Sequence, residues 1–270
     1  MPEEVVLPEN FVPPEVPDPP VTPKDSATVM LVRDGAAGIE VFLIRRVLGM
    51  AFAGGMTAFP GGGVDPRDAD TSVAWHGPEP DWWAGRFGVD QGLARALVCA
   101  AVRETFEESG VLLAGPDGDA IVSDTRPHAV ARQALVDREV SLAEFLAGAG
   151  LVLRADLLRP WANWVTPEAE RRRFDTRFFL AAVPAGQLAD GATSEAAEAG
   201  WVAPDVALDD WKQGRRALLP PTWTTLAELE DCASVADAMS RERVIGKLMP
   251  AIVRDPDGGG VRLVVNGVDR

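Results

Sequence analysis

The chain contains few residues of the kinds that build disulfide frameworks or nitrogen and sulfur metal sites. It has two cysteines and two histidines among 270 residues. Cys99 and Cys232 are too few for a disulfide framework or a cysteine metal cluster, and we expect Cys99 to be a buried structural thiol. His76 and His128 have no partners at ligand spacing, so we expect both to be structural or exposed.

Long apolar runs are absent as well. No stretch of eighteen apolar residues occurs, and no basic segment followed by an apolar one stands at the amino terminus. We therefore expect no membrane span and no export signal. The final residues, Asn266 to Arg270, do not match a peroxisomal address of the Ser-Lys-Leu type, so we expect a cytoplasmic protein.

Positive charge is scarce relative to negative charge. The chain has 26 lysines and arginines against 41 aspartates and glutamates, a net charge of −15. Binding to nucleic acid requires a basic footprint that neutralises phosphates, so we expect no nucleic-acid partner. A small nucleotide held by a metal ion and a few arginines is compatible with this charge. The sequence leaves open whether the protein is a monomer or a homodimer.

Residues 103 to 113 read RETFEESGVLL and predict the end of a helix that stops at a glycine. Glu104, Glu107 and Glu108 share one face because positions i, i+3 and i+4 lie on the same side of a helix. Carboxylates this close repel one another unless positive charge lies among them. The pattern predicts a site for Mg²⁺ or Mn²⁺, which prefer oxygen ligands; a solvated acidic face is the alternative. The opposite face is apolar, with Val98, Cys99, Val102 and Phe106.

Upstream, Phe59 to Gly63 (FPGGG) predicts a tight turn whose backbone can approach a ligand. Together with the acidic helix it resembles the Nudix box, G-x5-E-x7-R-E-U-x-E-E-x-G-U with U aliphatic. Counting from Gly62, Asp68 stands where the box has glutamate, and Thr105 occupies an aliphatic position. Residues 69 to 102 number thirty-four where the box allows seven, so an insertion of twenty-seven residues splits it.

The split box resembles the subgroup of Nudix hydrolases that includes the animal peroxisomal coenzyme A diphosphatase. The resemblance continues through Trp164 to Pro167, Arg173 to Phe179 and Pro220 to Trp223. It implies an α/β fold, the Nudix-type α/β/α sandwich with a mixed sheet and extra C-terminal helices. We expect one hydrolase domain over 25–270, an insertion at about 69–89, and a proline-rich tail at 1–24.

The resemblance implies that the enzyme uses a metal ion to direct water onto a diphosphate. Glu104 and Glu108 are then the first candidates for direct metal ligands, and the Gly61 carbonyl is a further one by analogy with the family. Glu107 either completes the ligand set or acts as the general base. Arg103, at i+4 from Glu107, is expected to hold that carboxylate in place.

Candidates for further roles lie downstream. Glu195 and Glu198 are the candidates for a distal base or extra ligand, with exposed loop charges as the alternative. Arg173 and Arg177 alternate along a predicted strand with Asp175 between them, so the two arginines share a face and could grip phosphate. An ordinary solvent-facing strand is the alternative for this pair.

Coenzyme A, cleaved to 4′-phosphopantetheine and adenosine 3′,5′-bisphosphate, is the substrate that the subgroup implies. Arg46 and Gly55 fit the family's coenzyme A signature, whereas Ala51 takes the place of its second arginine. Arg46 is therefore a candidate for binding a substrate phosphate. Hydrolysis of an ADP-ribose- or NADH-like diphosphate is the competing activity. A non-catalytic nucleotide-sensing module is a third possibility, which the intact glutamates argue against.

Hydrophobic periodicity and turn signals place the remaining elements. Strands are predicted over 27–33, 39–46, 158–165, 173–182, 201–202 and 261–265. Helices are predicted over 90–109, 128–139, 141–147, 205–213, 221–231 and 234–243. The insertion is rich in tryptophan and proline, so we expect a packed loop with one helical turn near 81–86. We also expect Trp82 and Trp83 within it to shape substrate access.

Overall fold

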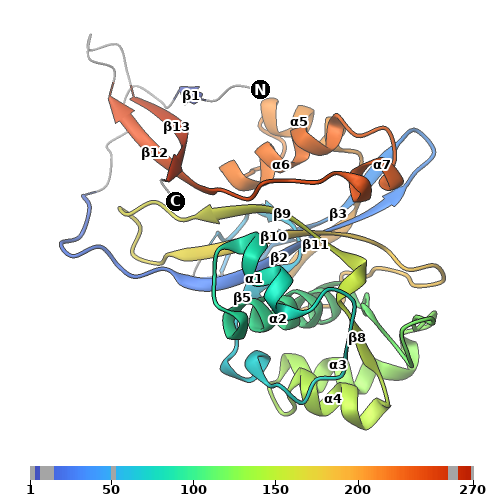
Figure 1. Ribbon diagram of the computed structural model, residues 1–270. Helices are drawn as coiled ribbons and strands as arrows, with labels where there is room; N and C mark the ends of the chain where they lie inside the picture. The colour runs from blue at the N-terminus through green and yellow to red at the C-terminus, as the bar shows by residue number, and fades with distance from the viewer. Residues whose placement is uncertain (1–3, 7–14, 50–52, 255–260, 269–270) are drawn as a thin grey trace.

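The computed structural model describes residues 4–6, 15–49, 53–254 and 261–268. A mixed sheet, in the order β1-β13-β12-β9-β10-β2-β3-β11, runs through the middle of the molecule (Figure 1). Two short strands, β4 and β5, pair with β3 and β2 beside this path. The strands are β1 (Glu4–Val6), β2 (Lys24–Asp34), β3 (Ile39–Arg46), β4 (Thr57–Ala58), β5 (Gly61–Gly63), β9 (Leu158–Val165), β10 (Phe174–Ala182), β11 (Ala196–Val202), β12 (Lys247–Arg254) and β13 (Val261–Val268).

Helices cover both faces of the sheet (Figure 1). One face carries α1 (Pro80–Phe87) and α2 (Gln91–Ser109), with α3 (Ala129–Val136) and α4 (Leu142–Ala149) beyond α2. The other face carries α5 (Pro204–Lys212), α6 (Pro220–Glu230) and α7 (Val235–Ser240). The segments between these elements contain three 3-10 turns, η1 (Pro66–Ala69), η2 (Arg126–His128) and η3 (Ala155–Leu157). They also contain a small sheet of β6 (Trp75–His76), β8 (Val152–Arg154) and β7 (Ala114–Gly115). The predicted α/β/α sandwich is confirmed.

Strand β2 lies at the centre because its two faces are both buried. Ala27, Val29 and Leu31 pack into the core under α2, whereas Met30 and Val32 pack into the core under α6. A strand buried on both sides has a continuous apolar run instead of an alternating one. It pairs in parallel with β10 and in antiparallel with β3 and β5.

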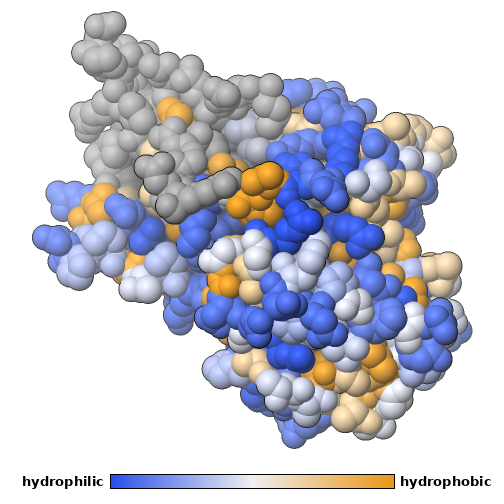
Figure 2. Space-filling view, viewed as in Figure 1, coloured by the Kyte–Doolittle hydropathy of each residue, from blue (hydrophilic) through white to orange (hydrophobic). Residues whose placement is uncertain are grey.

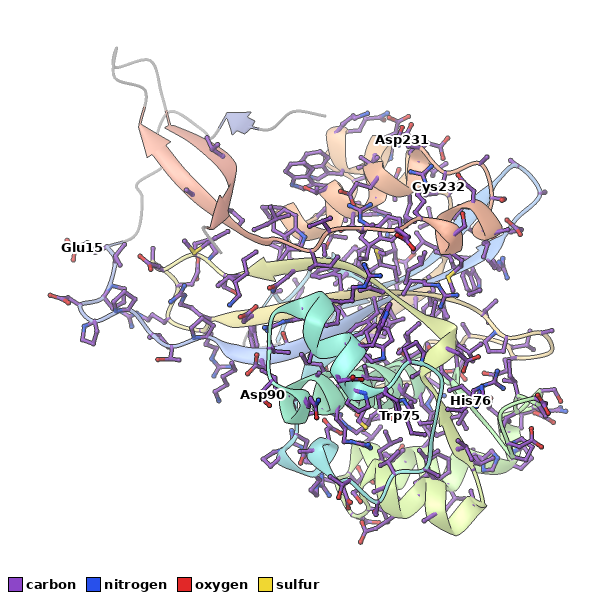
Figure 3. The ribbon with its side chains drawn as sticks, viewed as in Figure 1. Glu15, Trp75, His76, Asp90, Asp231 and Cys232 are labelled. Carbon is purple, nitrogen blue, oxygen red and sulfur yellow. The ribbon has the colours of Figure 1, made fainter. Side chains whose placement is uncertain are left out.

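Helix α2 carries the acidic motif and agrees with the predicted helix. Its N-cap is Asp90 (Figure 3). The Asp90 side chain accepts a 2.9 Å hydrogen bond from the Leu93 amide. It ends at Gly110, which has φ of 73°, a conformation that glycine adopts at little cost. Its predicted apolar face is buried, and no helix among the described residues is long and apolar enough to cross a membrane.

The insertion packs into the protein core. Helix α1 has eight residues, more than the single turn expected. Trp83 is 0% exposed and its ring lies 5.5 Å from the Phe179 ring and 6.1 Å from the Phe87 ring. The expectation that both tryptophans shape substrate access is therefore wrong for Trp83, because its ring fills space between α1 and β10. Trp82 is 38% exposed.

Four strands of the main sheet, β1, β4, β5 and β12, were not predicted, and β5 forms where a tight turn was expected. Strand β12 joins the sheet by parallel pairing of Lys247 with Asn163 and of Leu248 with Trp164, which nothing in its sequence indicates. Within the proline-rich tail, β1 pairs in antiparallel with β13, and residues 15–23 are irregular and largely exposed. Residues 1–3 and 7–14 of the tail lie outside the described residues.

The surface differs between the two ends of the molecule. Figure 2 shows hydrophilic side chains over most of the visible face, with apolar patches at the lower right, where Figure 1 places α3 and α4. Val130 on α3 is 85% exposed. His76 is exposed and His128 is partly buried beside Phe145 on α4, as expected for histidines without ligand partners.

The burial of Trp83 predicts a large effect on stability. We expect Trp83→Ala to lower the free energy of unfolding by about 3–5 kcal/mol, because removal of a fully buried ring leaves a cavity. Trp82→Ala is the matched control, and we expect it to change stability by less than about 1 kcal/mol because its ring is partly exposed. Urea denaturation measures both, and equal losses would contradict the core position of Trp83.

Candidate active site

The fold brings the two halves of the split motif together. Strand β5 pairs with β2, with Gly61 opposite Thr28 and Gly62 opposite Ala27. The Gly61 amide donates a 2.8 Å hydrogen bond to Oε2 of Glu108 on α2. The acidic face of the helix therefore rests directly against the glycine strand, although the insertion separates them in the sequence.

Glycine is required in β5 because other groups fill the space of a side chain. A β carbon at Gly61 would lie 2.5 Å from the Ala27 carbonyl oxygen, and one at Gly62 would lie 2.6 Å from the Glu104 carboxylate. At Gly63 an added β carbon would meet no described atom within 4 Å. The first two glycines thus let the strand and the acidic helix approach each other.

Arg103 connects the elements around this contact. Its Nε and Nη2 donate to the two carboxylate oxygens of Asp68 at 2.9 and 2.8 Å. Nη2 also donates to the Gly63 carbonyl at 3.0 Å. Nη1 donates to Glu104 at 2.7 Å and to Glu107 at 3.3 Å. The arginine is therefore engaged with η1, β5 and its own helix, and it contacts the aspartate that replaces the glutamate of the family pattern.

The three glutamates are held in a site that raises their pKa values. Burial, with a smaller contribution from Glu107, raises the pKa of Glu104 to about 7, although Arg103 opposes the shift. Burial and the nearby Glu104 carboxylate raise the pKa of Glu108 well above its usual range. Burial also raises the pKa of Glu107. Burial is the largest cause of each rise in pKa and neighbouring carboxylates add to it, so the charged forms of these glutamates are disfavoured.

A cavity of about 130 Å³ opens over the acidic face of α2. Arg103 and the three glutamates line one side of it. The remaining walls come from η1, the end of α3 and the segment before β11, with Arg67, Arg138, Ser194 and Glu195 among their residues. Sequence reasoning missed Arg67 and Arg138, because no fixed spacing relates either residue to the motif and only the tertiary fold brings them to the cavity.

The structure separates the two distal glutamates. Glu195 lines the cavity and accepts a 3.3 Å hydrogen bond from Nη2 of Arg46. Glu198 lies in β11, where its carboxylate pairs with Arg45 at 3.1 Å and both side chains are at least half exposed. Glu195 and, through it, Arg46 are thus near the acidic cluster, whereas Glu198 is not among the cavity residues.

The structure does not bring Arg173 and Arg177 to the cavity, which corrects the expectation that they form a phosphate-binding face. Arg173 donates to the carbonyl oxygens of Thr166 and Val21. Arg177 is 1% exposed, and its Nη1 pairs with the carboxylates of Asp25 and Asp175 at 2.9 Å each. Both guanidinium groups are buried in contacts within the protein. Arg177 lies in β10, an interior strand of the sheet, whereas Arg173 directly precedes that strand.

The donor set fits a hard divalent cation in composition. Glu104 and Glu108 are carboxylates from adjacent turns of one helix, and the backbone of β5 lies against them. Within the described residues, however, no three acidic, histidine or cysteine side chains form a preassembled ligand group. In this arrangement Arg103 binds Glu104 and Glu107, and the Gly61 amide binds Glu108. A cation would have to compete with these donors.

The close fit at Gly62 can be tested by adding one methyl group. We expect Gly62→Ala to weaken Mn²⁺ binding about tenfold or more, because the β carbon displaces the Glu104 carboxylate. The fold should persist, since the displaced group is the end of a flexible side chain. Gly63→Ala is the control and should leave affinity nearly unchanged. Calorimetric titration with Mn²⁺ and thermal unfolding measure the two properties, and equal affinities for both variants would contradict the assignment.

Comparison with known proteins agrees with the motif. The family model described as the NUDT19 Nudix domain matches residues 90–229, just over half of the chain. The protein named "Putative nudix hydrolase 7" from Caenorhabditis elegans is 31% identical over 195 residues, which cover 71% of this chain and 57% of that protein. The acyl-coenzyme A diphosphatase NUDT19 of Xenopus laevis is 25% identical over 237 residues, which cover 73% of this chain and 61% of that protein. The chain thus spans about six tenths of the length of these relatives.

A solved structure supports the same conclusion. The crystal structure of a NUDIX hydrolase from Alicyclobacillus acidocaldarius superposes with a TM-score of 0.67 at 28% identity. The match covers 83% of this chain and 98% of that one. The fold, the split motif and the family match together identify this chain as a member of the Nudix hydrolases, in the NUDT19 Nudix domain family.

Proposed function

We propose that the protein hydrolyses the diphosphate linkage of coenzyme A or an acyl-coenzyme A with the help of Mg²⁺ or Mn²⁺. Water adds to one phosphorus atom, and the bridging oxygen leaves with the other. The products are 4′-phosphopantetheine, or its acylated form, and adenosine 3′,5′-bisphosphate. The observation that carries the proposal is the cluster of three glutamates against the glycine strand, in a chain of this family.

The residues that would hold the metal ion are Glu104 and Glu108, with Glu107 and the Gly61 carbonyl as further candidates. A bound divalent ion neutralises phosphate oxygens and lowers the pKa of a coordinated water. The repulsion between the buried carboxylates of Glu104 and Glu108 favours such an ion, since opposite charge relieves it.

The other residues of the site have roles that follow from their contacts. Arg103 positions the helix against β5 and η1 through its bonds to Asp68 and Gly63. Two carboxylates are candidates for the general base. Glu107 lies on the helix at the cavity, and Glu195 also lines the cavity, beside Arg46. Arg46 also remains the candidate for a contact to substrate phosphate, because a guanidinium can donate to two phosphate oxygens.

The substrate assignment rests on the relatives. The protein from Xenopus laevis is named an acyl-coenzyme A diphosphatase, and the split box resembles that of this subgroup. The chain spans only 61% of that relative, so the choice among diphosphate substrates requires a direct test. The acidic cluster could act on any diphosphate. The hydrolysis and the choice of substrate therefore need separate experiments.

Removal of one ligand charge tests the chemistry. We expect Glu108→Gln to retain less than about a tenth of wild-type turnover at saturating Mg²⁺, because it deletes a charged group without changing volume. Glu198→Gln is the matched control, since Glu198 is exposed in β11 outside the cavity, and its turnover should stay close to wild type. Steady-state kinetics and circular dichroism measure activity and folding. If folded Glu108→Gln keeps turnover above this level, Glu108 is not a required metal ligand.

A substrate panel tests the specificity. We expect coenzyme A or an acyl-coenzyme A to give the highest kcat/KM among coenzyme A species, ADP-ribose, NADH and nucleoside triphosphates, with products identified by mass. ADP-ribose or NADH cleaved at least as efficiently as every coenzyme A species would overturn the substrate assignment and leave the mechanism in place. Binding of nucleotides without any turnover would instead indicate a sensing module.

A further inference from the structure

The residue that ends α3 differs from those that end its neighbours. Helices α1, α2 and α4 end at glycines with φ of 64°, 73° and 64°. After α3 the C-cap is Asp137, with φ of −77°, and the left-handed residue follows one position later at Arg138, with φ of 60°. Its amide donates to the Leu135 carbonyl at 2.9 Å, which closes the helix. Glycine adopts this conformation freely, whereas any residue with a β carbon is disfavoured there.

A second residue fixes the backbone of Arg138 at the cavity. Nη1 of Arg67, in η1, donates to the Arg138 carbonyl at 3.2 Å. The Nε and Nη2 atoms of Arg67 are bound to the Asp65 carboxylate at 3.1 and 3.0 Å. These donors of Arg67 therefore bind groups within the protein, and the bond to the Arg138 carbonyl joins η1 to the end of α3. Both arginines line the cavity above the acidic face of α2.

The side chain of Arg138 is available to a ligand. The residue is exposed, and no acidic side chain of the described residues forms an ion pair with its guanidinium. Its positive charge nevertheless favours the charged form of Glu107 inside the site, against the rise in pKa that burial causes. Neutralising Glu107 is the simpler explanation for this arginine, but Arg103 already binds that carboxylate at 3.3 Å. A strained arginine without an internal partner, at the edge of an acidic cavity, is instead suited to an anion that arrives with the substrate.

We propose that Arg138 determines substrate specificity by binding a phosphate monoester on the nucleotide half of the substrate, separate from the diphosphate that is cleaved. Arg67 is the positioning residue that holds the Arg138 backbone. A phosphate monoester matches a guanidinium because it accepts two parallel hydrogen bonds and carries up to two negative charges. The inference rests on the proposed function, since it requires that the diphosphate lies over the acidic cluster. It narrows the substrates to diphosphates of nucleosides that carry an additional phosphate.

Binding of two nucleotides that differ by one phosphate tests the proposal without catalysis. Calorimetry on the full chain compares adenosine 3′,5′-bisphosphate with adenosine 5′-monophosphate. We expect the wild-type chain to bind the bisphosphate about tenfold more tightly, as one charge-assisted contact allows. Arg138→Gly should bind the two nucleotides equally within about twofold. Glycine is chosen because it suits the left-handed backbone, so the fold is kept.

Two further variants separate the role of Arg138 from a general effect of charge. Arg138→Lys should keep part of the preference, because it keeps the charge and loses the paired donors. Arg126→Ala removes an arginine of η2 whose side chain is 89% exposed and paired with Asp124. This variant should keep the full preference for the bisphosphate. A wild-type chain that binds the nucleotides equally, or binds neither, overturns the proposal. So does an Arg138→Gly variant that keeps the full preference.

Kinetics distinguish this inference from the proposed function. With coenzyme A and dephospho-coenzyme A as substrates, we expect Arg138→Gly to lower kcat/KM about tenfold for the first, mainly through KM, and less than about twofold for the second. Equal losses for both substrates would contradict a phosphate contact. If neither compound is hydrolysed but the nucleotide preference and its loss are observed, the proposed function fails while the role of Arg138 stands.

Discussion

The buried guanidinium of Arg103 is the interaction on which the site depends. It holds the carboxylate of Asp68 in η1, the carbonyl of Gly63 in β5 and two glutamates of its own helix. Removal of one partner from a buried ion pair typically costs about 3–5 kcal/mol, because the remaining charge is left without compensation. Electrostatic contacts, as well as apolar packing, therefore set the position of the glycine strand relative to the acidic helix.

The same cluster encloses like charges within a scaffold of apolar residues. Glu104 and Glu108 are enclosed together, and burial disfavours the charge of each. The surrounding layers are made of tightly packed apolar residues, including a strand whose central side chains are 0% exposed. Such a scaffold can tolerate a local excess of negative charge. Functional sites commonly contain buried charged groups that lower stability.

Local signals in the sequence were enough to predict the part of the site that lies on α2. The start of the helix near residue 90, the glycine at its end and its apolar face all depend on neighbours within a few residues, so a pattern of fixed spacing reveals them. The glycine segment was expected to be a tight turn, but residues 61–63 form strand β5 and none of these three glycines has a positive φ. Its pairing with β2 and the contact of Asp68 with Arg103 then follow from the fold.

Features that depend on distant contacts were not predicted. The alternation of Arg173 and Arg177 indicated a shared face, but the side chains that surround β10 decide that both arginines are buried. The sequence around Trp83 indicated a packed loop, whereas its contact with Phe179 makes α1 part of the core. Strand β12 contains no pattern that specifies pairing with β9, because its partners lie more than eighty residues earlier in the chain.

The parallel pairing of β2 with β10 has a consequence for the order in which the protein folds. Ser26 and Thr176, which share a 2.7 Å hydrogen bond across these strands, are separated by 150 residues. At a synthesis rate of about 5–20 residues per second, β2 waits roughly 8–30 s for this partner to leave the ribosome. Until then one edge of β2 has no strand to pair with, although β5 and α2 already exist. The pairing of β2, the strand against which β5 lies, can therefore be completed only after the chain has passed β10.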